Sequence, residues 1–155
     1  MRLSMTCLLL VGVLVAGSTE AQTTGFPGFN DYTITGLGSG STSCTALTFA
    51  TPVTLNFQIS TAGPGRVVYL MASDLPCFPG TFTGFTCQGT TFDLIWTPSF
   101  FFTPLPLTGP FGFTGTSLAV PPLLAPFRFS TQCAIIDPGC AGLVLFTQAY
   151  EVILI

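Results

Sequence analysis

Proline and glycine recur at short intervals along the chain, and this feature constrains the fold more than any other. The 155 residues include 17 glycines and 13 prolines. They are distributed along the chain, where they separate short segments, rather than concentrated in one linker. Proline breaks helices because it lacks a backbone N–H and clashes with the preceding turn. The runs between these residues are short and rich in β-branched and aromatic side chains, which favour strands. The sequence therefore predicts an all-β fold.

The clearest predicted strand is Val53–Ser60, in which apolar and polar residues alternate throughout. Such alternation is typical of a strand with one dry face and one wet face. After a turn at residues 62–65, Arg66–Ala72 is apolar on both faces, which indicates a central, covered strand. We expect these two strands to pair as a hairpin.

Further short runs with strand composition follow at similar spacing. These runs are Tyr32–Thr35, Ala46–Ala50, Thr91–Trp96, Phe100–Thr103, Gly112–Val120, Phe127–Ile136, Leu143–Phe146 and Ala149–Leu154. In the run that begins at Phe127, we expect Cys133 to face inward and Arg128, Ser130, Gln132 and Ala134 to lie on the opposite face. Eight to ten short strands separated by turns predict an antiparallel two-sheet β-sandwich, immunoglobulin-like or jelly-roll-like.

The first residues have the pattern of a secretory signal. Arg2 gives a positive start, Cys7–Ala16 is an apolar run, and small residues lead to Ala21. The run is too short for a membrane-spanning helix, which needs about 20 apolar residues. We expect residues 1–21 to be a signal peptide and residues 22–155 to be a single exported domain without a transmembrane helix, either secreted or held at the cell surface or in the periplasm.

Five cysteines remain after that cleavage, and exported domains use such residues as disulfides. The sequence alone does not fix their pairing. The simplest arrangement pairs Cys77 with Cys87 across a turn-rich loop, and Cys133 with Cys140 across a proline–glycine turn. Cys44 would then be a free buried thiol or would link two chains. No pair has the close spacing of a structural zinc site, and we expect no metal or cofactor.

Composition excludes several classes of function. The chain has no histidine, its three basic residues are all arginines, and its net charge is −3. Histidine-dependent catalysis and lysine Schiff-base chemistry are therefore excluded, and nucleic-acid binding lacks the necessary cations. Asp93 and Glu151 are the candidates for acid–base work. The simpler interpretation is that they face solvent or pair with Arg66 or Arg128, so we expect no enzymatic activity.

Phenylalanine is unusually abundant, with sixteen residues in the chain. A domain of this size either buries them in a two-sided strand or exposes some as an apolar contact surface. The residues that would form such a surface are Phe100, Phe101, Phe102, Phe111 and Phe113. Trp96 and Tyr69 could bind a sugar ring, but both lie in apolar strand patterns and are expected in the core.

The C-terminal segment carries a longer pattern. It reads Phe-Ser-Thr-Gln-Cys-Ala-Ile-Ile-Asp-Pro from Phe129, then a turn, a short apolar run and Ala-Tyr-Glu-Val ending at Val152. This resembles the ending of many uncharacterised exported proteins of planctomycete-like and myxobacterium-like bacteria, in which a tryptophan occupies the position of Cys133 and Ser-Asn that of Thr147-Gln148. The resemblance implies a small secreted β-rich domain and brings no activity. It also implies that Cys133 and Cys140 arose together as a local bridge.

Three functions are compatible with these observations. The preferred one is an exported, non-enzymatic structural or adhesive module that contacts an envelope or extracellular protein, a polysaccharide or a second copy of itself. The alternative is a module that binds a carbohydrate or a small apolar ligand. A hydrolase that uses Asp93 and Glu151 would require the two carboxylates to meet in an open cleft.

Overall fold

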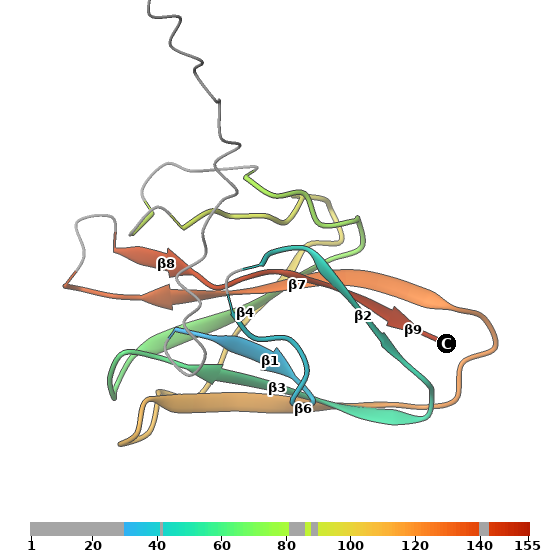
Figure 1. Ribbon diagram of the computed structural model, residues 1–155, viewed down its shortest axis with the longest axis horizontal. Coiled ribbons are helices and arrows are strands. Elements are labelled where there is room, and N and C mark those ends of the chain that lie inside the picture. The colour runs from blue at the N-terminus through green and yellow to red at the C-terminus, as the bar shows by residue number, and fades with distance from the viewer. Residues whose placement is uncertain (1–29, 41, 81–85, 88–89, 140–142) are drawn as a thin grey trace, which may run out of the picture.

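The computed structural model describes residues 30–40, 42–80, 86–87, 90–139 and 143–155. These residues form nine strands and no helix, in two sheets packed face to face (Figure 1). The predicted all-β two-sheet sandwich is confirmed. The predicted signal peptide, residues 1–21, lies outside the described residues.

The smaller sheet is antiparallel, with the strand order β1-β3-β6. Its strands are β1 (Tyr32–Ile34), β3 (Val53–Ser60) and β6 (Phe113–Val120). β3 has the bounds that alternation predicts, because Leu55, Phe57 and Ile59 are buried against the other sheet while Gln58 faces solvent. Apolar burial on one face thus fixes the register of this strand.

The larger sheet has the order β2-β9-β7-β4-β5, with β8 also paired to β7. Its strands are β2 (Thr45–Phe49), β4 (Val67–Ser73), β5 (Phe101–Pro104), β7 (Phe127–Ile136), β8 (Val144–Phe146) and β9 (Tyr150–Leu154). β2 and β9 pair in parallel, from Thr45 opposite Tyr150 to Phe49 opposite Leu154. The sheet is therefore mixed rather than purely antiparallel. Almost the whole chain separates these two strands, so no hairpin turn dictates their direction.

The expected hairpin of β3 and β4 is wrong, because the two strands lie in different sheets. β3 pairs with β1 and β6, whereas β4 pairs with β5 and β7. The turn at residues 62–65 carries the chain from one layer to the other. A Gly-Pro-Gly signal predicts a change of direction without saying whether the next strand pairs or crosses.

A layer without regular strands covers the outer face of the larger sheet. It is formed by the described parts of residues 74–100, which lie beside β7 and β8 on the side away from the smaller sheet (Figure 1). Leu94 and Phe92 pack there against Met71 and Ala134. The predicted strand at Thr91–Trp96 is therefore wrong, since this run serves as a cover rather than as part of a sheet.

This cover explains why β7 is buried on both faces. Cys133 and Ile135 belong to the core between the sheets, as expected for the inward face. Ser130, Gln132 and Ala134, which were expected on the face opposite Cys133, are also buried. Of the four residues predicted to face away from the core, only Arg128 at the open end of β7 is exposed.

Candidate functional site

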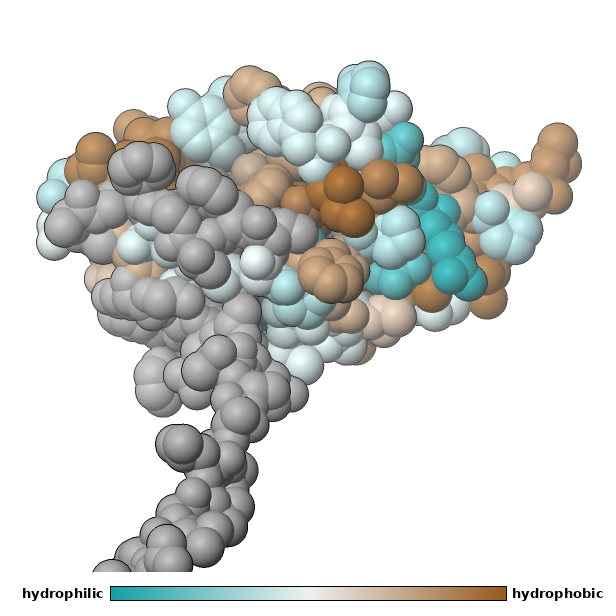
Figure 2. Space-filling model, turned by 90° about the horizontal axis from the view of Figure 1, so that it is seen from above, coloured by the Kyte–Doolittle hydropathy of each residue, from teal (hydrophilic) through white to brown (hydrophobic). Residues whose placement is uncertain are grey.

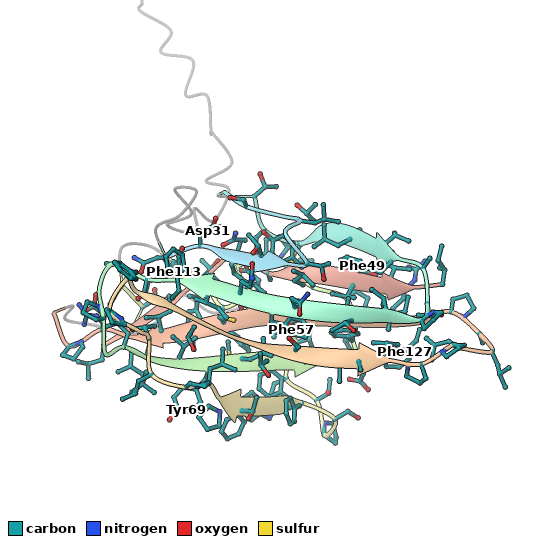
Figure 3. The ribbon with its side chains drawn as sticks, turned by 90° about the horizontal axis from the view of Figure 1, so that it is seen from below. Asp31, Phe49, Phe57, Tyr69, Phe113 and Phe127 are labelled. Carbon is teal, nitrogen blue, oxygen red and sulfur yellow. A yellow bond between two sulfur atoms is a disulfide. The ribbon has the colours of Figure 1, made fainter. Side chains whose placement is uncertain are left out.

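An apolar cleft of about 640 Å³ opens between the two sheets along the free edge of β6. Leu70 and Ala72 of β4 form its floor with Phe129 of β7, and Thr116 and Leu118 of β6 line it from the opposite sheet. Phe57 and Phe127, labelled in Figure 3, line it from β3 and β7. A concave apolar site with few polar groups is the usual form of a ligand or partner pocket.

Strand register places these side chains in one cleft. Ala72 pairs with Phe101 of β5 and with Thr131 of β7, and Leu70 pairs with Thr103. Directly paired residues point to the same side of a sheet, so all of them face the smaller sheet. The short side chain of Ala72 leaves space at the centre of this row.

The mouth of the cleft is formed by exposed apolar side chains. Phe101, Leu118 and Phe127 have exposed fractions of 55%, 49% and 53%. Asp74 is the one ionisable residue in the described lining. A hydrogen bond from Thr97 Oγ1 (2.8 Å) lowers its pKa, so the carboxylate remains charged at neutral pH.

The five phenylalanines predicted as a contact surface do not form a single patch. Phe101 lines the inter-sheet cleft, whereas Phe102 is exposed on the opposite face of β5. Phe111 is the most exposed of them, at 87%, and Phe113 is also exposed. Phe100 is partly buried against the outer face of the larger sheet.

Trp96 was expected in the core but is 72% exposed. Its ring stacks on Phe100 with a centroid distance of 4.4 Å and an interplanar angle of 19°. Tyr69 is half-buried and makes an edge contact with Phe102. Seen from the side of the irregular layer, apolar surface occurs in several separate places (Figure 2). Trp96 is exposed because its run forms the cover rather than a covered strand.

A second concavity, of about 680 Å³, lies on the outer face of the smaller sheet. Thr33, Asn56 and Gln58 line it, with Phe113 at one end. Gly115 forms its floor, where an added Cβ would lie 2.3 Å from the carbonyl oxygen of Phe57. Hydroxyl and amide groups around a shallow floor, with one ring beside them, can hydrogen-bond and stack against a polar ligand.

The two candidate acid–base residues lie in different environments, and neither lines the cleft or the outer concavity. Asp93 is buried, which corrects the expectation of a solvent position. Its carboxylate accepts hydrogen bonds from Ser43 Oγ, Thr91 Oγ1 and the backbone N–H of Gly80. Asp93 is thus a buried, hydrogen-bonded carboxylate that faces neither concavity. Glu151 pairs with Arg128 at 3.5 Å, as its simpler interpretation anticipates.

Gln132 is a buried hydrogen-bonding residue that sequence reasoning missed. Its Nε2 donates to the carbonyl oxygens of Thr91 and Thr147, each at 2.8 Å, and its Oε1 accepts from the backbone N–H of Asp93 at 2.9 Å. The amide thus joins β7 to the irregular layer and to the segment after β8. The available signal was an amide next to the inward-facing Cys133, in the apolar half of the strand.

Gln148 has a comparable role near the start of β9. Its Nε2 donates to Asp31 Oδ1 and to the carbonyl oxygen of Tyr32. The hydroxyl of Tyr150 also donates to Tyr32 O, at 2.9 Å. Burial raises the pKa of both tyrosines. Gln132 and Gln148, two polar residues of the C-terminal segment, therefore join neighbouring parts of the fold by hydrogen bonds rather than forming an open site.

The disulfide pairing differs from the simplest local arrangement. Cys44 and Cys77 are bonded to each other, so Cys44 is neither free nor a link between chains and Cys77 does not pair with Cys87. Cys87 is itself disulfide-bonded. Sequence proximity failed as a guide because the residue before β2 and the loop after β4 meet at the covered face.

Cys133 is a free thiol, so the expected bridge to Cys140 is also wrong. Cys133 pairs with Leu70 across the strands and points into the core between the sheets. Burial raises the pKa of this thiol, which therefore stays protonated. Cys140 lies outside the described residues.

Within the part of the chain that the structure describes, no three histidine, cysteine, aspartate or glutamate side chains are grouped so that they could hold a metal ion, and no helix is long and apolar enough to cross a membrane. No family model matches the sequence, and no curated protein or solved structure matches it.

Proposed function

We propose that this chain is an exported, non-catalytic contact module of the cell exterior, and that its contact site is the apolar cleft between the sheets. The cleft carries this proposal. It is open to solvent, its mouth is formed by Phe101, Leu118 and Phe127, and it continues inward to Leu70 and Ala72. Leaving such side chains in water is costly, and open apolar concavities mark sites that bind a partner.

Charge supports the same function. The net charge is −3 over 155 residues, and Asp74 alone brings an ionisable group to the described cleft lining. Binding of an apolar partner therefore desolvates no charged side chain of the described lining other than Asp74. The carboxylates of Asp93 and Glu151 are already hydrogen-bonded and ion-paired, respectively, which favours a contact function over a hydrolytic one.

An environment-sensitive aromatic dye, the anion 1-anilinonaphthalene-8-sulfonate, tests the site on the folded chain. We expect the fluorescence of the dye to increase and saturate when it binds the native chain. Phe101→Ser should weaken the affinity for the dye about tenfold, equal to about 1.4 kcal/mol. Phe111→Ser is the matched control, because Phe111 is more exposed but lies outside the described cleft lining. Absence of dye binding to the native chain, or equal loss in both variants, would contradict the proposal.

Export is part of the proposal and rests on the N-terminal signal pattern and the resemblance of the C-terminal segment. Expression of the chain from Met1 should give an extracytoplasmic product that begins at Gln22. Mass spectrometry of the intact product measures this directly. A product that retains residues 1–21 would contradict cleavage.

Carbohydrate binding is a second candidate, supported by the outer concavity. Gln58 and Phe113 offer an amide and an exposed ring beside the floor at Gly115. Affinity electrophoresis in gels that contain neutral polysaccharides tests it, with Gln58→Ala and Phe113→Ala as variants. Retardation that both variants abolish supports sugar binding, whereas identical mobility in every gel contradicts it.

A further inference from the structure

We propose that the cleft binds an extended peptide segment of a partner protein as an added strand along β6. Alternate apolar side chains of the peptide would point into the cleft, and a basic residue would lie near Asp74. This inference rests on the proposed contact function and names the chemistry of the partner.

The first support is the free edge of β6. Among the described strands β6 pairs with β3 alone, along its full length from Phe113 to Val120. At its start, Thr114 Oγ1 donates to the carbonyl oxygen of Pro106 (2.7 Å), so the loop before β6 occupies that end. The following residues face the cleft opening. An edge strand presents backbone N–H and C=O groups on which another strand can pair.

The second support is the position of the cleft beside this edge. β4 and β5 project past β6 in Figure 3, so the space next to β6 has a floor from the other sheet. That floor contains Leu70, Ala72, Phe101 and Thr103. Side chains of a strand alternate between its two faces. A strand paired with β6 would therefore direct every second side chain onto this apolar floor and the others to solvent.

The same geometry favours a single peptide over a second copy of this chain. If two copies paired through β6, the projecting β5 of each would occupy the layer beneath the other's β6. A lone strand brings no second layer and fits above β5. The charged carboxylate of Asp74 lies within the cleft lining and would attract a lysine or arginine at one end of the strand.

The probe is a capped synthetic peptide of alternating valine and threonine with lysine at one end, measured by calorimetry on the disulfide-intact chain. Two further peptides carry N-methyl groups on either the valine or the threonine amides. Backbone groups of alternate residues point to opposite edges of a strand. We therefore expect one methylated peptide to lose at least about tenfold in affinity and the other to bind as the parent does.

Variants locate the binding. Ala72→Leu fills the floor and should weaken parent-peptide binding by about tenfold or more, whereas Phe111→Ser should leave it unchanged. Asp74→Asn should weaken binding at low salt, with less effect at high salt. Each comparison uses the circular dichroism spectrum to confirm that the variant is folded.

The outcomes separate this inference from the proposed function. If the aromatic dye binds but the peptides do not, or if neither methylation changes the affinity, strand addition is overturned and the contact function stands. If neither dye nor peptide binds, both fail. If the chain elutes as a dimer, and Leu118→Asp converts it to a monomer, the occupant of the cleft is a second copy of this chain. That result would also overturn the peptide as occupant.

Discussion

Cys44 and Cys77 form a disulfide that ties the residue before β2 to the loop after β4, across a sequence separation of 33 residues. The bond joins the far edge of the larger sheet to the layer that covers it. Neither cysteine lines the inter-sheet cleft, which lies on the other side of β4. Cross-linking thus stabilises the covered outer face of the sheet, whereas the cleft opens beside Leu70 and Ala72 on the inner face of β4.

This arrangement predicts a large loss of stability when the bond is removed. Closing a loop of this length stabilises a fold by about 3–4 kcal/mol on the chain-entropy model. The double variant Cys44→Ala/Cys77→Ala should therefore melt about 10 °C lower. Cys133→Ala, which removes a thiol without a partner, should cost only about 1–2 kcal/mol. Equal melting temperatures for the double variant and the native chain would refute the structural role of this bond.

Gln132 should matter far more than an exposed glutamine. Gln132→Ala would leave two carbonyl oxygens and one backbone N–H without their amide partner. We expect a loss of about 3 kcal/mol or more, since each buried orphaned group costs about 1–3 kcal/mol. Gln58→Ala, on the solvent face of β3, should change stability by less than about 0.5 kcal/mol. Urea unfolding of both variants measures the difference, and similar midpoints would contradict the network.

Gly115 is required by close backbone approach between β3 and β6. A Cβ at this position would lie 2.3 Å from the carbonyl oxygen of Phe57. Gly115→Ala should therefore destabilise the domain by about 1–3 kcal/mol. Gly63→Ala is the control, since nothing lies within 4 Å of its added Cβ. Thermal melting of the two variants measures this, and an unchanged midpoint for Gly115→Ala would show that the strands can separate without cost.

Alkaline pH should unfold the domain through Tyr32 and Tyr150. Burial raises the pKa of both phenols in the folded state, so folding favours the protonated form. Stability is then complete below the unfolded-state pKa of about 10 and is lost as pH rises above it. Melting temperature and phenolate absorbance, followed together from neutral to alkaline pH, should change in the same interval. If these two tyrosines ionised while the fold remained equally stable, their burial would be disproved.

Local pattern identified strands well where one face of the strand meets the core. Val53–Ser60 and Phe127–Ile136 have the bounds that composition and alternation predict. The same reasoning failed at Thr91–Trp96, since a run of apolar and aromatic residues can cover a sheet as well as join it. Periodicity indicates which side chains of a segment are buried. It does not indicate whether the backbone of that segment pairs with a neighbouring strand.

The candidate site was only partly predictable. Abundant phenylalanine indicated exposed apolar surface, and Phe101 does line the cleft. Leu118, Phe127 and Ala72 carried no signal of their own, because the cleft depends on β5 projecting past β6. The disulfide between Cys44 and Cys77 was missed for a similar reason, since distant segments meet only through sheet order.

The amino-acid sequence by itself determined that this chain forms strands and cannot use histidine or lysine chemistry, because backbone preference and side-chain inventory are local properties. The tertiary structure alone decided which strands share a sheet, which cysteines meet and where an apolar cleft remains open. Those outcomes depend on contacts between residues far apart in the chain, and local periodicity carries no information about such pairing.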